Sequence, residues 1–167
     1  MKVMLKSLVA PRNAALALAA IVLAALALAH ALEAAGFTPC ELCYWQRYPY
    51  YAAVPLLLLG AFSRLARPAL ALAALLFVLD LALALYHSGV EAGIFELPAA
   101  CGAATLGAAD LEQLRAQLLA TEPVRCDRPA LTVLGLSLAN WNVLFAAFLS
   151  VLAILALRHG GSEATGG

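Results

Sequence analysis

Two cysteine pairs are the residues of this chain whose type and spacing point to chemistry. Cys40 and Cys43 form a Cys-x-x-Cys motif within TPCELCYWQRYPYY, and Arg47 follows four residues after the second cysteine. Two intervening residues let both sulfurs meet in a disulfide, and they also let one thiolate attack while the other resolves. Cys101 and Cys126 lie further along the chain, about 25 residues apart. These residue types indicate thiol–disulfide exchange.

The position of the motif predicts that a thiolate is stabilised there. Cys43 is expected near the N-terminus of a helix, where free backbone N–H groups and the helix dipole favour an anion. Arg47 comes one turn later, at i+4, so its guanidinium is expected on the same face. Aromatic residues crowd the segment, as is typical of a membrane interface. They are Tyr44, Trp45, Tyr48, Tyr50 and Tyr51.

The composition shows which elements must position these cysteines. Of 167 residues, 65% are hydrophobic and only 12% are charged. About half apolar residues is typical of a soluble domain, so lipid is expected to be the solvent for most of this chain. The formal net charge is zero, and nothing suggests nucleic acid as a partner.

Four uncharged apolar runs predict an all-α membrane protein. A helix needs roughly 20 residues to cross the hydrocarbon core. We expect a single domain over residues 1–158, folded as a four-transmembrane-helix bundle. The expected spans are residues 13–34, 44–63, 68–87 and 137–157. The second run is short, so it must borrow the residues around Arg47, whose charged head is expected to snorkel toward the interface.

Basic residues predict the orientation in the membrane. They cluster before the first expected span, between the second and third, and after the fourth, at Lys2, Lys6, Arg12, Arg64, Arg67 and Arg158. The positive-inside rule then places both termini in the cytoplasm and all four cysteines on the outer side. An alternative is that the N-terminal run is a cleaved secretory signal. Its apolar stretch is longer than the usual signal core of about 7–15 residues, which argues against that alternative.

The second outer loop covers residues 88–130. Within it, DLEQLRAQLLA at residues 110–120 is expected to form a short amphipathic helix, with Asp110 and Gln113 spaced as a capping box. The tail, residues 159–167, is expected to be flexible.

Two other roles for the cysteines are weighed. Cys101 and Cys126 as a purely structural staple of the outer loop would stabilise it by roughly 3 kcal/mol. In the second alternative role, all four cysteines bind one zinc ion. The second pair lacks the short spacing typical of zinc ligands, and an oxidising compartment disfavours thiolates, and both points argue against this role. We therefore expect no metal. The sequence also has no motif for a nicotinamide or a flavin.

These features together resemble the disulfide bond formation protein B (DsbB) family. The resemblance covers residues 1–158 and includes YHSGVE at residues 86–91 and GLSLANWN at residues 135–142. It implies a membrane protein-disulfide oxidoreductase of the bacterial inner membrane. Such an enzyme reoxidises a periplasmic thioredoxin-like thiol oxidase (DsbA) and passes the electrons to the membrane quinone pool. The cofactor that the resemblance implies is a quinone, ubiquinone or menaquinone.

The resemblance also implies a role for each cysteine. Cys101 and Cys126 form the disulfide that the partner's thiolate attacks, and Cys101 makes the mixed disulfide. Cys126 then exchanges with Cys40 of the Cys40–Cys43 pair. Cys43 is left as the thiolate that contacts the quinone.

Three further residues are singled out. By resemblance, Arg47 lies at an oxygen of the quinone and His87 lies near its ring. The segment RCDRPALTV around the last cysteine lacks the aromatic residue typical of that part of the family. Asp80, inside the third expected span, matches no family feature. It is expected on one helix face with Ala84 and His87, either bonded to a neighbouring helix or forming a proton route with His87.

Two competing functions stay open. One is a quinone-epoxide reductase resembling vitamin K epoxide reductase, but in that family the loop pair precedes the Cys-x-x-Cys motif, which is the reverse of the order here. The other is a disulfide-stapled membrane subunit that only binds partners.

Overall fold

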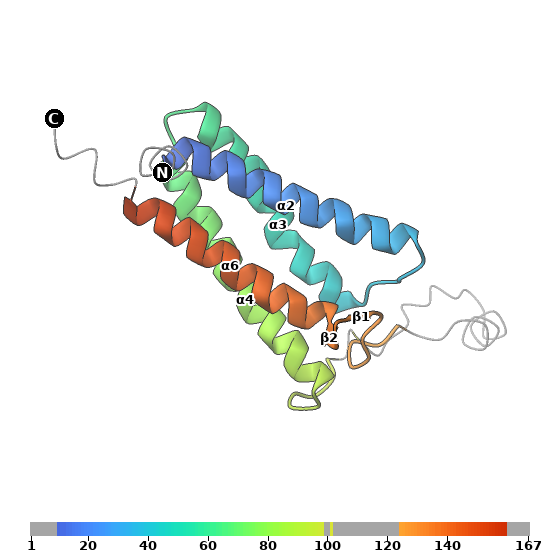
Figure 1. Cartoon of the computed structure of the whole chain (residues 1–167). Helices are drawn as coiled ribbons and strands as arrows, with labels where there is room; N and C mark the ends of the chain where they lie inside the picture. Colours follow the sequence, from blue (N-terminus) through green and yellow to red (C-terminus); the bar gives the residue numbers. More distant parts are fainter. Residues whose placement is uncertain (1–9, 99–100, 102–123, 160–167) are drawn as a thin grey trace, which may run out of the picture.

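Four long helices make up most of the part of the chain that the structure describes, residues 10–98, 101 and 124–159. The structure is a computed structural model, and its helices pack side by side (Figure 1). In chain order they are α2 (Pro11–Ala34), α3 (Glu41–Phe62), α4 (Ala66–Glu91) and α6 (Leu138–His159). The all-α expectation is confirmed in the described part. The expected amphipathic helix at residues 110–120 and the tail after residue 159 lie outside it.

Three of these helices, α2, α4 and α6, are long and apolar enough to cross a membrane. They correspond to the first, third and fourth expected spans. Helix α3 has 22 residues, but it carries Glu41, Gln46 and Arg47 in its first turns and two prolines further on. Those polar residues make the mean hydropathy of α3 lower than that of α2, α4 and α6. The crossing of α3 therefore stays a prediction.

Close contact between α3 and α4 depends on a glycine near their turn. A Cβ added at Gly60 would come within 2.3 Å of the Ala69 Cβ, closer than two carbon atoms approach. The turn itself is closed by Ser63, whose Oγ accepts a hydrogen bond from the Leu65 backbone N–H at 3.2 Å. The hydrogen of glycine thus lets the two helices approach where the chain reverses.

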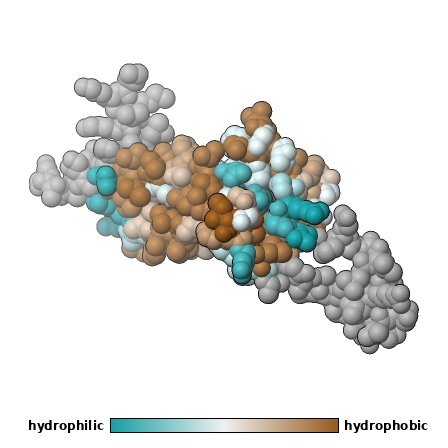
Figure 2. All heavy atoms as spheres, turned by 90° about the horizontal axis from the view of Figure 1, so that it is seen from below, coloured by the Kyte–Doolittle hydropathy of each residue, from teal (hydrophilic) through white to brown (hydrophobic). Residues whose placement is uncertain are grey.

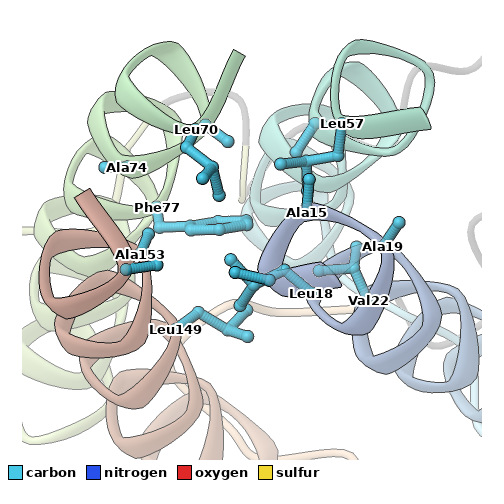
Figure 3. Close-up of a cluster of buried hydrophobic side chains, with 14 of the residues drawn as sticks. Ala15, Leu18, Ala19, Val22, Leu57, Leu70, Ala74, Phe77, Leu149 and Ala153 are labelled. Carbon is cyan, nitrogen blue, oxygen red and sulfur yellow. The ribbon is translucent and has the colours of Figure 1, made fainter. Parts of the chain in front are cut away.

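The core is built from small and branched apolar side chains between all four helices. Figure 3 shows Phe77 of α4 extending toward the part of α2 that carries Ala15 and Leu18. Phe77 and Leu57 of α3 are fully buried. The many alanines let the helices pack closely, as small residues do in membrane bundles. Outside, apolar residues cover much of the face in Figure 2, and hydrophilic ones gather toward its ends.

A short hairpin precedes α6. Strands β1 (Thr132–Val133) and β2 (Leu136–Ser137) pair antiparallel around Leu134 and Gly135, which have φ of 54° and 80°. Positive φ at both turn residues is typical of a two-residue hairpin. This hairpin lies between the expected outer loop, residues 88–130, and the start of the fourth expected span, and the sequence did not predict it. Ser137 donates a hydrogen bond to Glu91 and so links the start of α6 to the end of α4.

Candidate active site

Cys40 is the N-cap residue of α3. Its sulfur accepts a hydrogen bond from the Cys43 backbone N–H at 3.4 Å, and the two sulfurs lie 3.0 Å apart without being bonded. A group at this position lies at the positive end of the helix dipole. The sequence assigned that effect to Cys43. The structure assigns the N-cap to Cys40 because α3 begins at Glu41.

His87 of α4 lies against this dithiol. Its Nε2 is 3.5 Å from the Cys40 sulfur, and its Nδ1 is 3.5 Å from Oε1 of Gln46. An amide oxygen only accepts hydrogen bonds, so Nδ1–H donates to Gln46, and Nε2 faces the sulfur, where it accepts from the thiol or, when it carries a proton, donates to the thiolate. Glu91 Oε1 is 3.9 Å from the same Nε2. Gln46 therefore orients His87 toward Cys40.

Sequence reasoning singled out His87 but missed Gln46 and Glu91. Helical spacing was the available signal, because Gln46 follows Cys43 by three residues and Glu91 follows His87 by four. The contact between Gln46 and His87 joins residues 41 positions apart on different helices. Only packing of α3 against α4 brings them together.

The surroundings of Cys40 favour its thiolate. The hydrogen bond with the Cys43 sulfur has the largest effect and lowers the pKa of Cys40. Burial raises this pKa, whereas the hydrogen bond to His87 lowers it further, and together these influences bring it to about 5. An unperturbed cysteine has a pKa of about 8.5. Cys40 in the dithiol is therefore mostly thiolate at neutral pH, which makes it a good leaving group in disulfide exchange.

The second cysteine pair is a disulfide, as the resemblance predicted. Cys101 and Cys126 are bonded, and both are buried, at 4% and 0% exposure. They pack in the same apolar cluster as Cys40, together with Leu42 and Val90. The fold thus places the Cys101–Cys126 disulfide and the N-cap cysteine of α3 in one apolar cluster. This juxtaposition could not be read from the spacing along the chain.

Arg47 is held by an acid on the neighbouring helix. Its Nη1 donates a hydrogen bond to Oε2 of Glu33 on α2 at 2.6 Å, and Tyr44 donates to the other carboxylate oxygen at 2.6 Å. The guanidinium also lies 5.1 Å from the centre of the Tyr44 ring. The sequence predicted a snorkelling Arg47 but not this partner. Arg47 is buried, at 9% exposure.

A cavity of about 810 Å³ opens beside the dithiol. Its lining is mostly apolar, with a small set of polar side chains: Cys40, Cys43, Gln46, Arg47, Tyr50, His87, Glu91, Arg125, Arg128 and Asn142. Such a cavity has the size and the mixture of surfaces of a small-molecule site. Nε2 of Gln46 is buried without a hydrogen-bond partner among the described residues. A ligand with an acceptor oxygen would satisfy that donor.

The same residues offer ligands to a metal ion. One ligand atom from each of Cys40, Cys43 and His87 lies within 4.8 Å of the others. The four-cysteine zinc site weighed from the sequence has a different ligand set, and it conflicts with the bond between Cys101 and Cys126. A bonded pair has no thiolate to give.

Comparison with known proteins agrees with this arrangement. The model of the family described as "Disulfide bond formation protein DsbB" matches residues 11–156. A similar chain is the "Uncharacterized protein RP370" of Rickettsia prowazekii (strain Madrid E). It is 31% identical over 130 residues, which cover 76% of each chain. No solved structure matches the chain.

Proposed function

The chain belongs to the disulfide bond formation protein DsbB family, and from this premise we propose that it oxidises the dithiol of a periplasmic partner and delivers the electrons to a membrane quinone. The observation that carries the proposal is the position of the bonded pair. Cys101 and Cys126 pack in one cluster with Cys40, and Cys40 lies 3.0 Å from Cys43 at the cavity. Two cysteine pairs in one buried cluster support a path for thiol–disulfide exchange.

The exchange balances in four steps. A partner thiolate attacks Cys101, the Cys101–Cys126 bond breaks, and Cys126 leaves as a thiolate. Cys126 then attacks Cys40 of an oxidised Cys40–Cys43 pair, so that Cys43 leaves with the electron pair. The second partner thiol resolves the mixed disulfide at Cys101, and Cys101 then attacks Cys126 and releases Cys40. The partner ends oxidised, the loop disulfide re-forms, and two electrons rest on Cys40 and Cys43.

His87 manages the proton of Cys40 in this scheme. With Nδ1–H directed to Gln46, Nε2 accepts the proton of the Cys40 thiol and returns it when the thiolate must be neutralised. Glu91 Oε1 lies 3.9 Å from the same Nε2. The backbone N–H of Cys43, in the first turn of α3, donates to the Cys40 sulfur. These groups together let the Cys40 sulfur form and break disulfide bonds.

The cavity fits a quinone by its donors and its lining. A bound quinone supplies a sink for two electrons and two protons. Its ring and tail are apolar, and its carbonyl oxygens only accept hydrogen bonds. Gln46 Nε2 is a buried donor without a partner in the described part, and Arg47 and His87 line the same cavity. We propose that these three residues hold the ring beside Cys43.

We further propose the orientation that the basic residues indicate, with both termini cytoplasmic and the cysteines periplasmic. The α2–α3 connection, the end of α4 and the hairpin lie at one end of the bundle, and the α3–α4 turn lies at the other (Figure 1). Reporter fusions test this directly. Fusions after residue 67 and at the C-terminus should report cytoplasm, and fusions at residues 36 and 107 should report periplasm. A periplasmic signal after residue 67 would overturn the orientation and the crossing of α3.

Cysteine variants test the relay. Cys101→Ser should abolish oxidation of a reduced thioredoxin-like partner, while the Cys40–Cys43 pair still reacts with quinone. Cys126→Ser leaves Cys101 as a thiol with no disulfide for the partner to attack, so turnover should stop. Mixed with the oxidised partner, its Cys101 thiolate should attack the partner disulfide and give a mixed disulfide between Cys101 and the partner, visible on non-reducing gels. Normal turnover in Cys126→Ser would contradict the order of exchange. A purely structural disulfide would instead lower stability in both variants without slowing thiol oxidation.

A further inference from the structure

Asp80 is an acid in the middle of an apolar helix that the relay leaves unused. It is completely buried on α4, on the same face as the buried Ala84 and His87. An acidic side chain at this depth is costly and is usually found where it has a specific partner. The sequence weighed a bond to a neighbouring helix against a proton route with His87. The structure shows the first: Asn142 of α6 donates its Nδ2 hydrogen to Asp80 Oδ2 at 3.0 Å.

The other end of the Asn142 amide is also engaged. Tyr50 of α3 donates its hydroxyl hydrogen to Oδ1 of Asn142 at 2.8 Å. The Tyr50 ring is itself held, with its centre 5.8 Å from that of Phe145 and 6.2 Å from that of Phe77. An acceptor at the nitrogen and a donor at the oxygen select one orientation of the amide. Asn142 has two N–H groups, so one remains available to a ligand.

Tyr50 and Asn142 line the same cavity as the dithiol. Tyr50 follows Cys43 by seven residues on α3, which corresponds to about 10 Å further along the helix at 1.5 Å per residue. The cavity therefore has polar groups at two depths. One set, around Gln46 and Arg47, lies beside the dithiol, and the second lies deeper among apolar side chains. A quinone ring has two carbonyl oxygens on opposite sides, which matches two separated polar positions.

We propose that Asn142 and Tyr50 form an inner subsite that binds the quinone carbonyl oxygen farther from Cys43 through the second N–H of Asn142. Asp80 is the positioning residue of this subsite. Because its Oδ2 accepts from Nδ2, it prevents the amide from turning and presenting its oxygen, which would repel a carbonyl oxygen. The inference rests on the proposed function, since it requires a quinone in the cavity.

The test measures binding rather than turnover. A short-tailed benzoquinone, isotope-labelled at one or the other carbonyl carbon, is titrated into the purified protein in detergent, and its two carbonyl stretching bands are followed by infrared spectroscopy. Both bands should be shifted from their free values in the wild type. In Asn142→Leu one band should return to its free value, with affinity about fivefold weaker, the size of one lost hydrogen bond. Asp80→Leu should broaden the same band, because without an acceptor at position 80 only Tyr50 fixes the Asn142 amide.

Matched variants keep the outcome decisive. Asn140→Leu removes an amide two residues earlier on α6 that does not line the cavity, so it should leave both bands unchanged. Thermal unfolding without quinone identifies variants that fail to fold. If Asn142→Leu does not fold, Tyr50→Phe, which keeps the ring and loses the hydroxyl, takes its place. Tyr50→Phe should also broaden the carbonyl band that Asn142→Leu is expected to shift. Unchanged bands and affinity in folded Asn142→Leu, or in its replacement Tyr50→Phe, would overturn the subsite alone. A wild type that binds no quinone would overturn the subsite and the proposed function together.

Discussion

Replacing His87 by phenylalanine is predicted to raise the pKa of Cys40. The substitution keeps a ring in the buried space and removes both nitrogens, including the Nε2 that lies 3.5 Å from the sulfur. A hydrogen bond to a charged group contributes about 1.5–3 kcal/mol, and the long distance here favours the lower end. Since about 1.4 kcal/mol corresponds to one pKa unit, the pKa should rise from about 5 to about 6.

The sign of the pH dependence follows from the reactive form. Only the thiolate is alkylated, and it predominates above the pKa and is lost below it. At pH 5 the thiolate fraction should fall from about one half to about one tenth, a fivefold slower reaction, whereas at pH 8 both proteins should react equally. The assay is iodoacetamide labelling of the reduced protein between about pH 4 and pH 9, with Cys40 followed by peptide mass spectrometry.

His30→Phe is the matched control. His30 is exposed, and its Nε2 bonds to the Tyr51 hydroxyl rather than to a sulfur, so its loss should not move the Cys40 profile. Two results would refute the reasoning. One is a His87→Phe profile that coincides with the wild type, and the other is a wild-type midpoint near the ordinary cysteine value of about 8.5.

Two further predictions concern the helix contacts that support the site. Gly60→Ala should destabilise the protein by about 1–3 kcal/mol, because the new Cβ would meet the Ala69 Cβ at 2.3 Å. Thermal unfolding measures this loss, and Leu59→Ala, at an exposed position, is the control. Equal melting temperatures for Gly60→Ala and the wild type would contradict the close contact. Glu33→Gln removes the partner of Arg47 at 2.6 Å, but Glu33 is partly exposed, so the same assay should show little change in melting temperature. A large drop in melting temperature would show that Arg47 is left buried and unpaired.

Features that depend on local sequence were predictable. Uncharged apolar runs located all four helices, and α3 differs from its expected start by three residues only because Cys40 caps it. The buried face of Asp80, Ala84 and His87 follows from helical spacing, and the structure confirms it. Likewise, the disulfide between Cys101 and Cys126 follows from the family resemblance.

Features that depend on packing between distant segments were not predictable. The bond between Tyr50 and Asn142 joins residues 92 positions apart, and that between Arg47 and Glu33 joins residues 14 apart on different helices. Nothing in the spacing of these residues marks them as partners, because the relative rotation of α2, α3 and α6 decides which side chains meet. Gln46 was overlooked for the same reason.

The central claim is that electrons pass from a protein dithiol through both cysteine pairs to a quinone. The most direct measurement is quinone reduction by the purified protein, followed by the loss of quinone absorbance after a reduced thioredoxin-like oxidase is added without oxygen. We expect one quinone to be reduced for each partner dithiol that is oxidised, and no quinone reduction in Cys101→Ser. Oxidation of the partner without quinone reduction, or equal quinone reduction in Cys101→Ser, would contradict this claim.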